Sequence, residues 1–345
     1  MQDYRVKVEQ EKCTWLVTGA AGFIGSNLVE ELLRLDQKVI GIDNFSNGFR
    51  ENIEDIKRQV PDKIENFDFI EGDICHYDIC LYGCSKADYI LHNAALNSVP
   101  RSIDNPRNTN RSNVTGTLNM LTAATQYKNI RRFVYAASSS TYGDHKALPK
   151  TEEVIGSPLS PYAVSKYVIE LYANVFHKVY NLDVLGLRYF NVFGKRQNPF
   201  LTYAAVIPKW CGLVLNGKQP TIFGDGLTTR DFCYIKNVIQ ANLLAAKAPK
   251  FDLKNRVMNI AYGQQTTLND LLAMIKKHLD GEHLETIYAP FRQADVQHSL
   301  ADTNRAREII GYDPQYTVNM GIKEYTDWYK ESHDWVPSEQ PKVRV

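Results

Sequence analysis

The sequence lacks the features that mark membrane, secreted and nucleic-acid-binding proteins. No apolar run approaches the ~20 residues that a membrane-spanning helix needs, and residues 1–12 lack the apolar centre of a signal peptide. The 40 basic residues nearly balance the 39 acidic residues, so no charge excess favours nucleic acid or an anionic membrane. We therefore expect a cytoplasmic protein that binds neither nucleic acid nor membranes.

Cysteine is also scarce, with 6 residues in a chain of 345. So low a content in a long chain argues against a disulfide framework. Cys75, Cys80 and Cys84 are clustered, but their spacing is not Cys-x-x-Cys and no matching His or Cys pair follows. We interpret the cysteines as reduced thiols and expect no metal site.

The most informative stretch is TWLVTGAAGFIG, residues 14–25, in which an apolar run meets three glycines. The pattern predicts a strand, a tight turn and a helix. Gly19 permits the turn, Gly22 lets the backbone approach a pyrophosphate, and Gly25 lets the helix lie close to its strand. Free N–H groups at the start of the helix would then face the phosphates. The stretch predicts a dinucleotide-binding site.

Acids follow the next two apolar runs. Residues 38–42 end in Asp43, about 20 positions beyond the glycines, where a carboxylate holds the adenosine ribose hydroxyls. Such an acid disfavours a 2′-phosphate, so the sequence predicts NAD rather than NADP; the alternative is an ordinary turn aspartate. Asp73, after a strand over residues 67–70, can accept from the adenine amino group. In the strand that begins at Tyr89, we interpret His92 as a packed residue rather than a catalyst.

Strands alternate with helices up to Gly194, which predicts a Rossmann-type, doubly wound parallel sheet of the α/β class. Helices are expected near residues 106–127, 161–180, 208–215 and 268–279. We expect a dinucleotide-binding domain over residues 1–187, with a later return segment near 232–260. A smaller C-terminal lobe over residues 188–231 and 261–345 would bind the substrate.

Tyr162 and Lys166 lie four residues apart near the start of a helix, so they share one face. A free tyrosine titrates near pH ~10, but an ammonium one turn away favours its phenolate. The phenolate could then exchange a proton with a substrate hydroxyl. The spacing is common by chance; its significance comes from its place after the fifth predicted strand and the serines that begin at Ser138.

With these residues in view, the sequence resembles the extended short-chain dehydrogenase/reductase family and, more closely, its nucleotide-sugar 4-epimerases. The resemblance covers nearly the whole chain, through the motifs GAAGFIG, GIDNFS, EGDI, LHNAAL, ASSSTYGD, SPYAVSK, LRYFNVFG, GDGLTTRDFCYI and FRQAD. The runs AALNSVPRSI and YAAVIPKW are similar to the subgroup that acts on N-acetylated UDP-hexosamines or their uronic acids. That subgroup serves bacterial surface polysaccharides such as O-antigen.

The resemblance implies roles for individual residues. Ser138 would hydrogen-bond the 4-oxygen of the sugar, Tyr162 would be the acid/base, and Lys166 would bind the nicotinamide ribose. The implied cofactor contacts, besides Tyr162 and Lys166, are Gly19, Gly22, Phe23, Ile24, Gly25, Asp43, Asn44, Asp73, Ile74 and Ala94. The implied substrate contacts are Asn97, Ser98, Ser139, Ser140, Asn191, Gln197, Ala205, Val206, Arg230, Arg292, Asp295 and Ser299.

Among the implied substrate contacts, Arg230 and Arg292 would clamp the UDP diphosphate, a task that suits paired guanidinium bonds. The small Ser299 would leave room for an N-acetyl group. Three features depart from the subgroup: Asn97 replaces a usual glycine, residues 198–202 are less polar, and Ala294 replaces glycine. These departures leave the preferred sugar open.

The resemblance implies C4 epimerisation of UDP-GlcNAc and UDP-GalNAc through a transient 4-keto sugar, with tightly bound NAD. The alternatives are the corresponding uronic acids, UDP-glucose, a net dehydrogenase or reductase, and a non-catalytic binder of NAD or UDP-sugar. Ser139 and Ser140 stand where dehydratases and decarboxylases need acids. Neither serine can do that acid work, so the sequence disfavours these two reactions. The family usually forms homodimers through a four-helix bundle, here from helices near 107–127 and 161–180.

Overall fold

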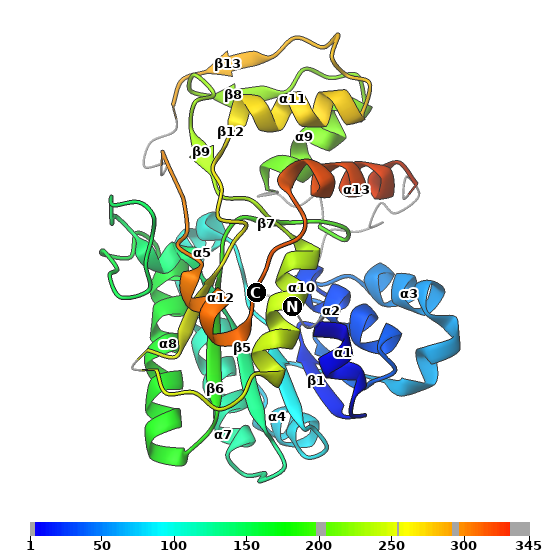
Figure 1. Cartoon of the computed structure of the whole chain (residues 1–345), viewed down its shortest axis with the longest axis vertical. Helices are drawn as coiled ribbons and strands as arrows, with labels where there is room; N and C mark the ends of the chain where they lie inside the picture. Colours follow the sequence, from blue (N-terminus) through cyan, green and yellow to red (C-terminus); the bar gives the residue numbers. More distant parts are fainter. Residues whose placement is uncertain (1–3, 198–204, 254, 292–296, 332–345) are drawn as a thin grey trace.

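The structure, a computed structural model, describes residues 4–197, 205–253, 255–291 and 297–331 (Figure 1). Its centre is a parallel sheet of 7 strands in the order β11-β6-β5-β4-β1-β2-β3. The strands are β1 (Thr14–Thr18), β2 (Lys38–Asp43), β3 (Phe67–Glu71), β4 (Tyr89–His92), β5 (Arg132–Ser138), β6 (Val184–Tyr189) and β11 (Val257–Ile260). This topology confirms the predicted fold class.

Helices cover both faces of the sheet because alternate strand residues are apolar on each side. Val17 packs with the helices α2 (Phe23–Arg34), α3 (Arg50–Gln59) and α10 (Ile235–Lys247). Leu16, its neighbour, packs with α4 (Tyr77–Cys84), α7 (Gly116–Ala124) and α8 (Pro161–Tyr180). Residues near the N-terminus form α1 (Tyr4–Glu9), which buries Val8 against α10.

The strand order reverses at β1, which pairs with β2 on one side and β4 on the other. In open parallel sheets, ligands bind at the carboxyl ends of the strands where this reversal occurs. The loops after β1, β2, β4 and β5 meet at this edge and carry the predicted cofactor and catalytic residues.

The helix predicted near residues 106–127 exists, but it has three parts. It starts as α6 (Pro106–Asn110), loosens into a π-turn at Arg111–Thr115, and continues as α7. The π-turn presents Asn113, whose amide accepts from the Leu96 backbone N–H at 2.8 Å and donates to the Leu96 carbonyl at 3.0 Å. The turn therefore ties this helix to the segment after β4.

A smaller lobe lies over the carboxyl edge of the sheet (Figure 1). Its helices are α9 (Val206–Leu215), α11 (Leu268–His278) and α13 (Val318–Glu331), close to the predicted positions for the first two. Its short strands pair as β8 (Thr221–Phe223) with β13 (Ile287–Ala289) and β9 (Thr229–Arg230) with β12 (Thr266–Thr267). The short elements β7 (Val192–Phe193), β10 (Cys233–Tyr234) and α12 (Asn304–Ile310) lie between the sheet and this lobe along the chain. Within the larger part, the 3₁₀ turn η1 (Pro61–Asn66) precedes β3, α5 (Val99–Asp104) follows β4, and the 3₁₀ turn η3 (Ser139–Tyr142) follows β5.

Within the described part of the chain, every helix is too short or too polar to traverse a bilayer.

Candidate active site

The glycine turn between β1 and α2 leaves room for a ligand. Gly19 has φ +70°, and a Cβ there would lie 2.9 Å from the Ala94 nitrogen. A Cβ on Gly25 would lie 2.0 Å from the Gly19 carbonyl oxygen, so the helix can approach the turn only without a side chain. At Gly22, the N-cap of α2, no side chain caps the helix and a Cβ would meet only the Gly19 backbone, at 3.1 Å or more. The cradle and its uncapped N–H groups suit the phosphates of a dinucleotide.

Asp43 ends β2 beside this turn. Its carboxylate accepts the backbone N–H of Ala21 at 3.0 Å and of Phe45 at 2.7 Å. Burial raises the Asp43 pKa to about 6, although these backbone donors oppose the change. Asp43 therefore joins the glycine turn to the loop after β2. The pKa of its carboxylate depends on how far the surrounding residues shield it from water.

Asp73 and Ile74 lie in the loop after β3, and Asn44 directly follows Asp43 in the loop after β2. Asp73 accepts the Cys75 N–H at 2.8 Å and lies 3.7 Å from the Arg111 guanidinium. Burial alone would raise the Asp73 pKa, but the Cys75 donor, Arg111 and a hydrogen bond from Asn44 lower it. Ile74 is buried, and its side chain fills the space above Gly116 of α7. The remaining predicted cofactor contacts, Phe23 and Ile24, form the first turn of α2.

Ser138 and Tyr162 are brought together from β5 and α8. Their hydroxyls share a hydrogen bond that opposes the increase in the Tyr162 pKa caused by burial. The N-terminus of α8 is fixed because Ser160 accepts the Ala163 N–H at 3.1 Å and Ser102 accepts the Tyr162 N–H at 3.1 Å. Tyr162 is therefore held at the start of its helix with its hydroxyl at the end of β5.

Lys166 lies one turn further along α8, and its ammonium donates to the Ala136 carbonyl at 2.8 Å. Burial lowers the Lys166 pKa to about 8, and Glu170 opposes that decrease.

His92 is also buried, between the Thr18 hydroxyl at 2.7 Å from Nδ1 and the Thr117 hydroxyl at 2.9 Å from Nε2. Burial lowers the His92 pKa to about 3, so this residue is a neutral packed histidine.

Around the catalytic pair, Ser140 donates its hydroxyl to Ser138 at 2.9 Å, and Ser139 precedes it in η3. Ser98 caps α5 by accepting the Arg101 N–H at 3.2 Å. Asn97 accepts from the Asn47 side chain at 3.0 Å, so the residue that departs from the subgroup contacts the loop after β2.

The other predicted substrate residues surround the junction of the two lobes. Asn191 has φ +33° and donates to the Asp231 carbonyl at 3.1 Å. Gln197 donates to the Val192 carbonyl at 3.2 Å, while Ala205 and Val206 are the N-cap and first residue of α9. Arg230 donates to the Gln297 carbonyl at 3.2 Å, next to Ser299, whose N–H donates to the Thr229 carbonyl. Arg292, Asp295, Ala294 and residues 198–202 lie outside the described residues.

Asp231 is a site residue that the sequence reasoning missed. Its buried carboxylate accepts the N–H groups of Tyr262, Gly263 and Ala301, each at 3.1 Å. Burial raises the Asp231 pKa to about 6, against these backbone donors. It joins two segments, at residues 262–263 and at Ala301, beside Arg230. In the sequence, Asp231 could have been recognised as an acid that directly follows Arg230 and precedes the apolar run at 232–235.

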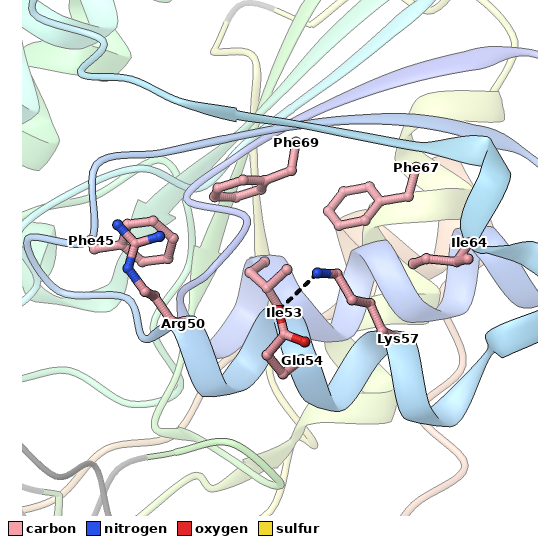
Figure 2. A pocket seen from close by; sticks show the side chains of 8 residues that line it. All are labelled: Phe45, Arg50, Ile53, Glu54, Lys57, Ile64, Phe67 and Phe69. Atoms are coloured by element: carbon pink, nitrogen blue, oxygen red, sulfur yellow. Dashed lines mark hydrogen bonds and ion pairs between the residues drawn. The ribbon is translucent and has the colours of Figure 1, made fainter.

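An apolar pocket of about 200 Å³ lies between α3 and β3, and none of the residues that line it is a predicted catalytic residue (Figure 2). The Arg50 guanidinium lies 4.2 Å from the centre of the Phe45 ring and pairs with Glu71 at 2.7 Å. At the rim, Lys57 pairs with Glu54 at 2.8 Å. The described charged groups of this pocket are thus already paired.

Comparisons with known proteins agree with this arrangement. The model of the NAD dependent epimerase/dehydratase family matches residues 15–261. A putative UDP-glucose 4-epimerase of Methanocaldococcus jannaschii is 36% identical over 92% of this chain and 99% of its own length.

Two solved structures are similar over most of the chain. A UDP-N-acetylglucosamine 4-epimerase from Methanobrevibacter ruminantium, in complex with UDP-N-acetylmuramic acid, has a TM-score of 0.86 and 36% identity over 93% of this chain and 99% of its own. A UDP-glucuronic acid 4-epimerase from Bacillus cereus, in complex with UDP-glucuronic acid and NAD, has a TM-score of 0.81 and 30% identity over 92% and 99%.

Proposed function

The chain belongs to the NAD dependent epimerase/dehydratase family, and we propose that within it the protein is a UDP-sugar 4-epimerase. The family resemblance predicted from the sequence is thereby confirmed, as is the dependence on NAD. The observation that carries the proposal is the half-buried Tyr162, hydrogen-bonded to Ser138 and one helical turn from Lys166, at the edge of the sheet that holds the glycine turn.

The proposed reaction has no net oxidation or reduction. Tyr162 removes the proton from the sugar 4-hydroxyl, and Ser138 hydrogen-bonds the same oxygen as it becomes a carbonyl. The Lys166 ammonium stabilises the phenolate, since an adjacent positive charge favours the ionised tyrosine. After the 4-keto sugar rotates so that its other face is presented, Tyr162 returns the proton to the 4-oxygen. NAD, which the glycine turn and Asp43 would hold, would supply the acceptor for the C4 hydride and the donor for its return to the opposite face of the ring.

The residues toward the diphosphate must hold UDP firmly while the sugar turns. Arg230 and Asn191 suit this task because a guanidinium and an amide donate to phosphate oxygens. Arg292 is proposed as the second arginine, and Asp295, Gln197 and Ser140 as further contacts to the substrate.

We propose UDP-GlcNAc and UDP-GalNAc as the preferred pair, for surface polysaccharide synthesis in the cytoplasm. Ser299 is small enough to leave space for an N-acetyl group, and one similar structure is named as a UDP-N-acetylglucosamine 4-epimerase. Other relatives are named for UDP-glucose and for UDP-glucuronate, so UDP-glucose and the N-acetylated uronic acids are the alternative substrates.

The test is to incubate the purified protein with UDP-GlcNAc, UDP-GlcNAcA or UDP-glucose without added NAD. We expect UDP-GalNAc to form fastest, with retained NAD and no net change in NADH absorbance. Stoichiometric NADH would instead indicate a net dehydrogenase. Failure to convert any of the three sugars in the NAD-loaded protein would refute the epimerase proposal.

We also propose a homodimer in which α8 and the α6–α7 helix of each subunit form a four-helix bundle. One face of α8 is apolar and exposed: Val164, Leu171, Val175 and Val179 are 48%, 49%, 50% and 67% exposed. Their spacing places them on a single side of the helix. Val175→Glu should convert a dimer into a monomer in light scattering; a wild-type monomer would refute this part of the proposal.

A further inference from the structure

We propose that the buried ion pair between Glu170 and Arg188 is a positioning element of the reaction. It joins the helix of Tyr162 and Lys166 to the segment of Ser138, and its carboxylate keeps the Lys166 ammonium charged. This inference rests on the roles proposed above for Tyr162 and Lys166.

The pair has the geometry of a rigid link between α8 and β6. Arg188 donates from Nε to one Glu170 oxygen at 2.9 Å and from Nη2 to the other at 2.7 Å. The two side chains are only 3% and 5% exposed. A bidentate guanidinium–carboxylate bond fixes orientation as well as distance. Because Glu170 lies four residues after Lys166, it shares the face of α8 that carries Lys166.

The other side of Arg188 contacts the Ser138 segment. Its guanidinium lies 4.8 Å from the centre of the Tyr142 ring. Tyr142 ends η3, the turn that starts immediately after Ser138, and its hydroxyl donates to Asn259 at 2.6 Å. Arg188 therefore contacts both pieces whose separation sets the distance between the Ser138 and Tyr162 hydroxyls.

The charges near Lys166 are few. Burial lowers the Lys166 pKa and Glu170 raises it. His92 on β4 and Tyr135 on β5 are buried and neutral, with pKa values moved away from neutrality mainly by burial. The Glu152 carboxylate accepts the Asn259 N–H at 2.8 Å and lies 3.8 Å from Arg305, while its backbone carbonyl accepts from Arg188 at 3.4 Å. The charged residues of the helices packed against α8 are exposed or half-buried: Arg101, Asp104, Arg107 and Arg111.

Removal of the Glu170 charge should lower the pKa values of Lys166 and Tyr162. In Glu170→Gln, the Arg188 cation remains without its anion, so both Lys166 and Tyr162 lose protons more readily. The two groups titrate as a pair, so both limbs of the kcat/KM profile should move together. We expect a shift of ~1 pH unit toward lower pH, the size typical of one buried charge at this range.

The experiment measures two quantities in NAD-loaded protein. The first is the pH profile of kcat/KM. The second needs no turnover: the ultraviolet absorbance of the Tyr162 phenolate against pH, obtained by subtracting the matching Tyr162→Phe protein from wild type and from Glu170→Gln. Both should move to lower pH in Glu170→Gln. The inference would be overturned if Glu170→Gln lowers the maximum of kcat/KM but leaves both limbs of the pH profile and the phenolate titration at the wild-type pH.

Asp183→Asn is the matched control. Asp183 is also a mostly buried carboxylate, paired with Arg132 at 2.6 Å and with Arg256, but it precedes β6 at the opposite end from the site. We expect a lower Tm with both pH readouts unmoved. An equal shift in Asp183→Asn would show that the effect is not specific to Glu170, and would also overturn the inference.

The double variant Glu170→Gln/Arg188→Met covers the case in which the single variant does not fold. It removes both charges, and exchange of a buried ion pair for a neutral pair is often tolerated. Its pH profile should return toward that of wild type, while kcat falls ~10-fold because Ser138 and Tyr162 are less well aligned. A wild-type kcat in the double variant would refute the positioning role. If wild type does not epimerise, the proposed function fails, but the phenolate titration still decides this inference.

Discussion

The role proposed for Asp43 predicts that NAD affinity depends on pH near 6. Burial raises the Asp43 pKa to about 6 in the protein without NAD. Ribose hydroxyls that donate to the carboxylate would stabilise its ionised form and lower that pKa on binding. NAD binding should therefore release a proton below pH 6, and affinity should fall ~10-fold, about 1.4 kcal/mol, for each further unit of acidification. Above pH 7 the affinity should be constant.

Asp43→Asn removes the charge and keeps the shape. Hydrogen bonds to a charged group contribute about 1.5–3 kcal/mol, so the NAD Kd at pH 8 should rise roughly 12- to 150-fold. The variant should also lose the dependence on pH, because no carboxylate remains to titrate. The Asn amide also faces the Ala21 and Phe45 N–H donors, now 3.0 and 2.7 Å from the Asp43 carboxylate, so we expect a lower Tm as well.

Calorimetric titration of NAD into stripped protein between pH 5 and 8 measures these effects. Asp68→Asn is the control, since Asp68 is an exposed acid on β3. It should leave both the affinity and its pH dependence unchanged. The reasoning is refuted if wild-type affinity is flat across pH 6, or if Asp43→Asn keeps the wild-type slope.

Three further predictions concern catalysis and stability. Tyr162→Phe should lower kcat ~10²- to 10⁴-fold in an epimerisation assay with little change in NAD affinity, and an active variant would exclude the proposed acid/base. Arg196→Met should destabilise the protein by at least about 1.5–3 kcal/mol in urea unfolding, because it removes charge-assisted bonds from a guanidinium with 0% exposure to Glu30 and Asp55, which keep only their pairs with Lys195, Arg34 and Arg58; a loss below about 1 kcal/mol would contradict this. Gly25→Ala places a Cβ 2.0 Å from the Gly19 oxygen, so it should cost at least about 1–3 kcal/mol and weaken NAD binding, and an unchanged Tm would argue against the observed turn.

Most of the sheet could be predicted from the sequence, because each parallel strand is a short apolar run and the glycine turn marks where the order reverses. The burial of Val17 and Leu16 on opposite faces follows from strand geometry alone. The pairing of Ser138 with Tyr162 follows from their place at the end of β5 and at the start of α8, which lie at the same edge of the sheet. Local pattern and overall topology agree in these regions.

The buried charges could not be predicted in the same way. In the sequence, Glu170 and Arg196 resemble ordinary surface residues. Their burial depends on partners far along the chain: Glu170 meets Arg188 across 18 positions, and Arg196 meets Glu30 across 166. The π-turn at Arg111–Thr115 has no local signature either, and the residue that it presents, Asn113, bonds to Leu96, 17 positions earlier in the chain.

The place of β11 in the sheet ties the two lobes into one unit. The chain leaves after β6, forms β7 to β10, and returns through α10 to lay β11 beside β6. Every residue of β6 is buried and all but Arg188 are apolar or aromatic, so a chain cut before β11 would leave this strand as an unprotected edge, a template for aggregation. The smaller lobe is thus formed by a segment that leaves the sheet and returns to it, and it is not a separable domain. We therefore expect the whole protein to melt in a single step.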